Sequence, residues 1–151
     1  MGTVVDTFSE LTPLIGADLG ASSWIEVDQD RINTFARATD DYQWIHTDQE
    51  RAKDGPFGQT IAHGYLTLAL LIPLWSELLE VREASTKVNY GLGKVRFPAP
   101  VPAGSRVRLR ATLAAVDPVP GGVQVTVDAI MECAGVAKPV CVAQPIFRFL
   151  A

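Results

Sequence analysis

The sequence predicts an α+β fold in which a curved antiparallel sheet wraps around one long, buried helix. Of the 151 residues, 48% are apolar, which suits one hydrophobic core better than two small ones, so we expect residues 1–151 to form a single domain. Residues 64–79 are apolar on almost every side of a helix. From Arg106 onward, polar and apolar residues alternate as they do in half-buried strands.

Two short helices are expected ahead of the long one. Asp28 is a candidate N-cap, and the apolar residues that follow it repeat with helical spacing as far as Thr39. Asp48 is a second start signal, and Gly55-Pro56 ends that helix within two turns. The long helix is expected over Gly64–Leu79, where it must be covered on most sides. Because its apolar run is shorter than the ~20 residues that span a bilayer, we expect a core helix and no membrane anchor.

Alternation and turn residues predict antiparallel strands in the second half of the chain. The expected strands are Trp24–Val27, Lys94–Phe97, Arg106–Leu113 and Val123–Asp128, with turns at Pro118–Gly122 and Ala134–Ala137. Pro139 and Pro145 indicate that the last strand is an edge strand or carries a bulge. A sheet of this kind packs most economically around the long helix, which is the hot-dog layout. It leaves a sheet edge and part of an apolar helix uncovered, so we expect a homodimer.

Composition excludes several classes of function. The net charge of −4 and a pI near 5.1 argue against a nucleic-acid partner. The start, MGTVVDTFSE, lacks the charged and apolar regions of a signal peptide, so a cytoplasmic protein is expected. Cys133 and Cys141 lack metal-ligand or disulfide spacing and are expected to be small buried residues. Arg106, Arg108 and Arg110 alternate on one strand face that we expect to be solvated.

Asp41 and His46 are the first candidate catalytic pair. They are five positions apart, so neither a helix nor a strand would bring their side chains together, and they converge only if the segment is irregular. An ionised carboxylate beside an imidazole could then hold and polarise a water molecule. The alternative is structural: Asp41 closes a turn and His46 is partly buried before the next helix. From spacing alone, the structural interpretation is favoured.

The segment Gly58–Gly64 is the second candidate, because it leads into the start of the long helix. The first N–H groups of a helix have no partner within it, so they could stabilise an oxygen that gains negative charge. Gly64 has no Cβ to obstruct a ligand, and the N–H of Tyr65 lies beside it. The alternative here is structural: Gly64 only allows the loop to continue into the helix, and His63 caps the helix or fills space.

Taken together, these segments resemble the MaoC-like (R)-specific enoyl-CoA hydratases. DDYQWIH, which ends at His46, is similar to the family's D-x-N-P-[ILV]-H signature. AHGY at 62–65, NYG at 89–91 and KVRFPAPVPAG at 94–104 resemble further family segments in the same order. The resemblance extends from about Trp24 to Phe149, and several ordered motifs are far more specific than one.

The resemblance implies Asp41 and His46 as the catalytic pair and Gly64 as the oxyanion donor. Gln43 and Trp44 stand where the family usually has Asn and Pro; Gln43 keeps an amide that could orient the Asp41 loop, whereas Trp44 could reshape the acyl pocket. The other residues expected near the substrate are His63, Tyr65 and Asn89, with Lys94 and Arg96 bordering the ligand channel.

The reaction that the resemblance implies is reversible syn addition of water to a trans-2-enoyl-CoA, which gives the (3R)-3-hydroxyacyl-CoA. An acyl-CoA thioester is therefore the expected partner, and no metal or other cofactor is expected, since hydration requires neither. One alternative is a hot-dog thioesterase, but such enzymes usually present a carboxylate from the central helix, and here only Glu77 and Glu80 lie near its far end. Another is a non-catalytic subunit that binds acyl thioesters without needing the Asp/His pair.

Overall fold

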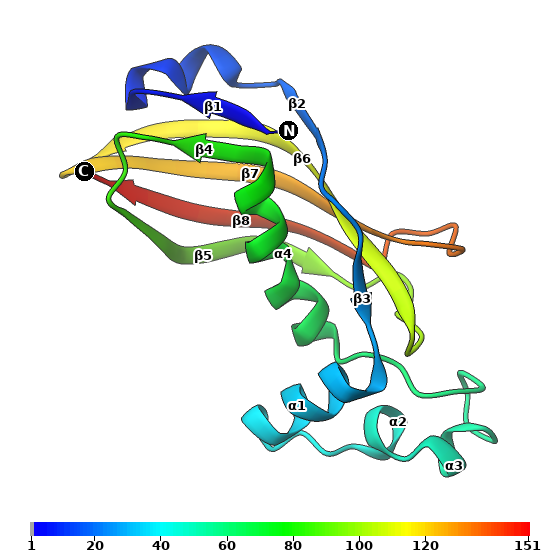
Figure 1. The fold of residues 1–151 in the computed structure, drawn as a ribbon. Helices are drawn as coiled ribbons and strands as arrows, with labels where there is room; N and C mark the ends of the chain where they lie inside the picture. The colour runs from blue at the N-terminus through cyan, green and yellow to red at the C-terminus, as the bar shows by residue number, and fades with distance from the viewer. Residues whose placement is uncertain (1) are drawn as a thin grey trace.

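The computed structural model describes residues 2–151, in which long antiparallel strands curve around helix α4 (Figure 1). The main strands are β5 (Thr86–Arg96), β6 (Ser105–Val119), β7 (Gly122–Cys133) and β8 (Cys141–Leu150). Their order across the sheet is β6-β7-β8-β5, and the short strands β2 (Asp18–Ala21) and β3 (Ile25–Val27) both pair with β6. All pairs in this sheet are antiparallel, so the predicted α+β hot-dog layout is confirmed.

Helix α4 (Gly64–Leu78) lies against the concave face of the sheet and provides six of the 29 buried residues of the core. Side chains alternate along β6, β7 and β8 between buried and more exposed positions, because successive residues of a strand point to opposite faces. The buried set meets α4; for example, the Trp75 ring stacks on Phe147 with centroids 5.4 Å apart. Among residues 2–151, none of the helices combines the length and the apolar character needed to cross a membrane.

Three short helices gather at the N-terminal end of α4 (Figure 1): α1 (Gln29–Thr39), α2 (Trp44–Thr47) and α3 (Gln49–Ala52). The two predicted N-caps are present, since Asp28 accepts a hydrogen bond from Arg31 N–H at 2.8 Å and Asp48 accepts one from Arg51 N–H at 3.0 Å. Asp40 is the C-cap that follows α1; it adopts a left-handed φ of 60° and turns the chain sharply into the Asp41 loop.

The remaining elements close the other end of the molecule. β1 (Thr3–Val5) pairs in parallel with β4 (Leu79–Val81), which follows directly on α4. Two 3₁₀ turns, Phe8–Glu10 and Thr12–Leu14, join β1 to β2. This small two-stranded sheet lies beside the C-terminal end of α4 (Figure 1).

The structure corrects two strand predictions. The last strand, β8, is not an edge strand, because it lies between β7 and β5. Pro145 is accommodated there because the β5–β8 register shifts between Leu92 and Val95, which supports the bulge that was the alternative. Strand β5 begins at Thr86, eight residues before the predicted start at Lys94. All of its residues except Val95 are exposed, so its first half lacks the alternation of buried and exposed side chains by which a strand is predicted.

Two predictions about side chains on the sheet are confirmed. Cys133 and Cys141 are free and buried, and burial raises the pKa of the Cys141 thiol to about 11. The arginines of β6 lie on its more exposed face, where Arg108 pairs with Glu132 at 2.6 Å and Arg110 with Asp18 at 3.2 Å. These ion pairs account for two of the three arginines, and the guanidinium groups of Arg106 and Arg108 both lie over the Trp24 ring.

Candidate active site

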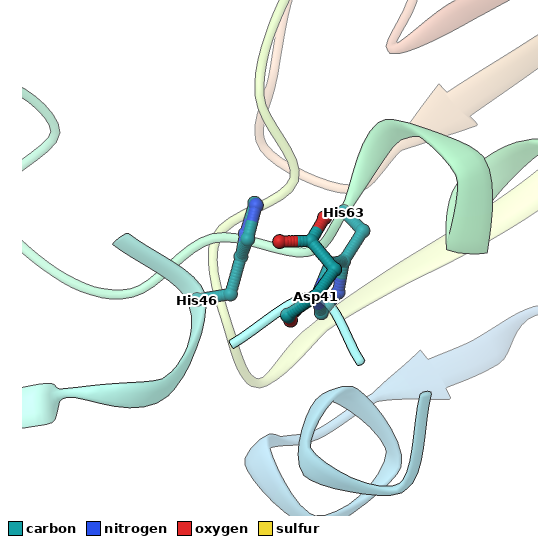
Figure 2. A group of neighbouring side chains, drawn as sticks. All are labelled: Asp41, His46 and His63. Atoms are coloured by element: carbon teal, nitrogen blue, oxygen red, sulfur yellow. The ribbon is translucent and has the colours of Figure 1, made fainter. Parts of the chain in front are cut away.

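Asp41 and His46 come together beside the start of α4. One carboxylate oxygen of Asp41, one ring nitrogen of His46 and one ring nitrogen of a third residue, His63, all lie within 4.8 Å of one another (Figure 2). The whole segment between the two residues was predicted to be irregular. In the structure only residues 40–43 are irregular, and His46 lies on the one-turn helix α2. The left-handed turn at Asp40 makes this possible, since it reverses the chain between the end of α1 and α2.

His46 is held in one orientation by its surroundings. Its ring is buried, and its Nδ1 lies 2.7 Å from the carbonyl oxygen of Ile61. Because a carbonyl only accepts hydrogen bonds, Nδ1 carries the proton and Nε2 is the basic nitrogen. Burial lowers the pKa of His46 below its ordinary value of 6.5; the neighbouring His63 ring lowers it too, while the Ile61 hydrogen bond and the Asp41 carboxylate act in the opposite direction.

The backbone of the His46 turn is anchored to α1. The side-chain amide of Gln29 donates to the His46 backbone carbonyl oxygen at 2.8 Å, and the Thr60 hydroxyl group donates to the side-chain oxygen Oε1 of Gln29. Neither Gln29 nor Ile61 was predicted as part of the site, because both contacts join segments that are far apart in the chain. No local spacing could have indicated them.

Asp41 is exposed, and its carboxylate points toward His46 (Figure 2). It also accepts a long hydrogen bond, 3.4 Å, from the backbone N–H of Gln43. The Gln43 amide makes no hydrogen bond within residues 2–151, so the expected role of that amide in orienting the loop falls to the Gln43 backbone instead.

A cavity of about 380 Å³ opens beside this group. His46 and Gly64 line it, together with apolar side chains from three segments. The remaining lining residues are Phe57, Ile61, Ala62, Thr67, Phe97, Pro98, Ala99, Pro100, Val101 and Val140. An apolar wall with one basic nitrogen at its edge suits a ligand that is largely hydrocarbon.

The start of α4 provides free hydrogen-bond donors at this cavity. No side chain caps the helix at His63, and the N–H groups of Gly64 and Tyr65 have no acceptor within residues 2–151. A Cβ on Gly64 would lie only 3.0 Å from the Phe97 ring, so glycine lets this ring pack closely against the start of α4. The unoccupied donors and the positive end of the helix dipole can stabilise an oxygen that gains negative charge.

Seven of the residues expected at the substrate do not line this cavity, among them Asp41, Lys94 and Arg96, of which the last two line a separate cavity of about 460 Å³. His63 is only 2% exposed and lies behind it, with its Nε2 bonded to the Asp41 carbonyl oxygen. Tyr65 is 73% exposed, because its side chain points out from α4 toward the edge of the Phe97 ring. Asn89 lies on β5 and lines a separate cavity of about 230 Å³ between α4 and the sheet. The side chains of these residues and of Gln43 therefore form no part of the cavity wall.

Trp44 also differs from expectation, since it does not reach the cavity. Its ring packs against Gly55, where a Cβ would come within 2.8 Å, and the Arg51 guanidinium lies 4.2 Å from the ring centroid. The bulky ring at the usual proline position therefore fills space on the far side of α2, because that one-turn helix directs residues 44 and 46 differently.

Three potential metal donors meet at this site, although spacing along the sequence predicted no such cluster. Asp41, His46 and His63 lie within 4.8 Å of one another. One nitrogen of each imidazole is already engaged, His46 Nδ1 with Ile61 and His63 Nε2 with Asp41. The expectation that no metal is required remains a prediction.

Comparisons with known proteins agree with this architecture. A family model described as MaoC like domain matches residues 10–133. The chain is 49% identical over 147 residues, 97% of each protein, to the 3-hydroxyacyl-thioester dehydratase Z of Mycobacterium tuberculosis.

Solved structures support the fold. An (R)-hydratase from A. caviae involved in PHA biosynthesis aligns with a TM-score of 0.73 at 17% identity over 89% of this chain and 96% of that one. A MaoC-like dehydratase from Rhodospirillum rubrum aligns with a TM-score of 0.69 at 21% identity over 91% and 93% of the two chains. The hot-dog fold, the extent of the family match and the close relative agree with the motifs in the sequence, and the chain belongs to the MaoC-like dehydratase family of hydro-lyases.

Proposed function

We propose that the chain catalyses the reversible hydration of a trans-2-enoyl thioester to the (3R)-3-hydroxyacyl thioester. The observation that carries the proposal is that His46, with Asp41 beside it, lines one apolar cavity together with the uncapped start of α4. The (3R) product and the CoA carrier rest on the resemblance to the (R)-specific hydratases. The relative from M. tuberculosis, whose name describes a dehydratase of 3-hydroxyacyl thioesters, supports the substrate class.

The proposed mechanism assigns one step to each part of the site. His46 Nε2 takes a proton from a water molecule held with Asp41, and the water oxygen bonds to C3 of the enoyl group. The C2–C3 π electrons move toward the thioester, whose oxygen gains negative charge and accepts a hydrogen bond from Gly64 N–H. C2 then takes a proton from the Asp41/His46 pair, and the thioester carbonyl re-forms. The net change is addition of H and OH across the double bond.

The direct test replaces each member of the pair. Asp41→Asn and His46→Gln keep the approximate size of each side chain but remove the carboxylate and the basic ring nitrogen. Each positioned proton transfer contributes roughly 10²- to 10⁴-fold, so we expect each variant to lose crotonyl-CoA hydration by at least 100-fold while its circular dichroism spectrum is unchanged. Gln43→Ala is the matched control, because its amide makes no hydrogen bond within residues 2–151. Near-normal turnover in a folded pair variant would remove that residue from the mechanism.

Two observations favour hydration over thioester hydrolysis. Glu77, near the C-terminal end of α4, accepts hydrogen bonds from both the N–H and the hydroxyl group of Ser23 at 2.8 Å. Glu80 lies on β4, beyond the helix, and its carboxylate lies 3.7 Å from Arg82. Neither carboxylate lines the cavity beside His46. Release of free thiol from an acyl-CoA, without hydration of the enoyl-CoA, would favour the thioesterase.

We also propose that the chain forms a homodimer through strand β5. Within residues 2–151, β5 pairs only with β8, so one backbone edge is unpaired. Val88, Tyr90 and Leu92 are exposed along it, and Tyr65 is exposed on α4. A second copy would cover both surfaces. Analytical ultracentrifugation at micromolar concentration should give the mass of a dimer, and a monomer there would refute this proposal.

A further inference from the structure

His63 joins the two halves of the proposed site, although its side chain lies outside the cavity. Its Nε2 lies 2.9 Å from the backbone carbonyl oxygen of Asp41, and its own peptide leads directly to the Gly64 N–H. Because a carbonyl oxygen only accepts, Nε2 is the protonated nitrogen. The side chain of this one residue thus holds the Asp41 loop, while the next residue, Gly64, lines the cavity and has an unpaired backbone N–H within residues 2–151.

The His63 ring also supports His46. The two imidazoles stack with centroids 3.9 Å apart and an interplanar angle of 25°. On its other side, His63 contacts the Phe35 ring of α1 at 4.8 Å. His46 is therefore fixed from two directions, by the Ile61 carbonyl oxygen along its edge and by His63 against its face.

A purely structural role does not explain why this residue is a histidine. Within residues 2–151, His63 Nδ1 is the one buried side-chain nitrogen or oxygen that has no hydrogen-bond partner. An unsatisfied buried acceptor is unfavourable, and an apolar ring of similar shape would avoid it. What an apolar ring cannot provide is the hydrogen bond from Nε2 to the Asp41 loop.

We infer that His63 is a positioning residue that ties the Asp41 loop to the first turn of α4 and so fixes the distance between the water-activating pair and the oxyanion donor. This inference rests on the proposed function and deepens it. An enzyme that adds water at C3 while stabilising charge on the thioester oxygen must hold both groups at one separation. His63 sets that separation from behind the cavity, without contacting the substrate.

The test compares two substitutions at this position. His63→Phe keeps a planar ring against His46 but loses the donor, whereas His63→Gln keeps an amide nitrogen near the position of Nε2. We expect His63→Phe to lower kcat for crotonyl-CoA hydration about 10- to 100-fold, since displacement of about 1 Å can cost 100-fold, with KM changed less than about threefold. His63→Gln should recover most of the lost kcat. The Tm of His63→Phe should be within a few degrees of wild type, or above it.

Hydrogen exchange gives a readout that does not depend on activity. The amides of residues 40–47 should exchange faster in His63→Phe than in wild type or His63→Gln, because only His63→Phe releases the loop. Phe35→Leu is the matched control, since it alters packing against the His63 ring but leaves the hydrogen bond. We expect it to lower Tm while kcat stays within about threefold of wild type.

The outcomes separate this inference from the proposed function. If His63→Phe retains wild-type kcat, or if His63→Gln loses as much activity as His63→Phe, the inference is wrong and the proposed hydration stands. If the wild-type chain hydrates no enoyl thioester, the proposed function fails. In that case, an unchanged rate of amide hydrogen exchange at residues 40–47 in His63→Phe would also refute the claim that His63 holds the Asp41 loop.

Discussion

Replacing Gly64 with alanine tests the role of the Gly64 N–H as oxyanion donor, because the added methyl group would press against the Phe97 ring and displace the start of α4. A Cβ at this position would lie 3.0, 3.1 and 3.2 Å from three atoms of the Phe97 ring, which are shorter than ordinary van der Waals contacts. Phe97 is 39% exposed and lines the cavity, so its ring can move. We expect the ring or the first turn of α4 to shift by a few tenths of an ångström, and the protein to fold.

The expected effect on stability is small. Alanine is favoured over glycine in a helix interior by roughly 1 kcal/mol; Gly64 is the first residue of α4, so only part of this gain applies, and it offsets part of the cost of displacing the Phe97 ring. The effect on catalysis is larger, because the Gly64 N–H must point at the thioester oxygen as charge develops. Removing an oxyanion donor costs about 10²- to 10³-fold in kcat. Since Gly64→Ala displaces the donor without removing it, we expect about a 10- to 100-fold loss.

The assay follows the loss of enoyl absorbance of crotonyl-CoA, alongside thermal unfolding. Gly91→Ala is the matched control: a Cβ there meets nothing within 4 Å, its φ is not positive, and it lies outside the main cavity. Its kcat should remain within about threefold of wild type. Wild-type kcat in Gly64→Ala would refute the assignment of this N–H, while unfolding of Gly64→Ala would refute the claim that Phe97 can yield.

Three further predictions concern titration, capping and the buried thiols. Because burial lowers the pKa of His46 and the base must be neutral, kcat/KM for hydration should fall in acid with an apparent pKa below 6.5; a pH-rate profile limited at higher pH would contradict this. Asp28→Ala should lower the free energy of unfolding in urea by about 1 kcal/mol, since Asp28 accepts the Arg31 N–H at 2.8 Å; an unchanged midpoint would deny the cap. Cys141, whose thiol pKa is raised to about 11, should resist alkylation at pH 8 until denaturant is added. Alkylation of Cys141 in the native chain, measured by mass spectrometry, would contradict this.

Local patterns were sufficient for the elements whose residues carry a strong signal. The caps Asp28 and Asp48 and the apolar circumference of α4 depend on neighbours within a few residues, so the sequence predicted them correctly. Strand β5 was underestimated because an exposed edge strand carries little alternation. The order of strands depends on long-range pairing, and the place of β8 inside the sheet could not be inferred from its prolines.

By itself, the sequence determined which chemical groups are available: a carboxylate and an imidazole five residues apart, and a glycine at the start of an apolar helix. Only the tertiary structure decided which of these groups meet. His63 was predicted to contact the substrate, yet the fold buries it against His46 and the Asp41 carbonyl oxygen. The physical reason is that an imidazole's role depends on what its two nitrogens contact, and those partners come from segments 15 to 22 residues away.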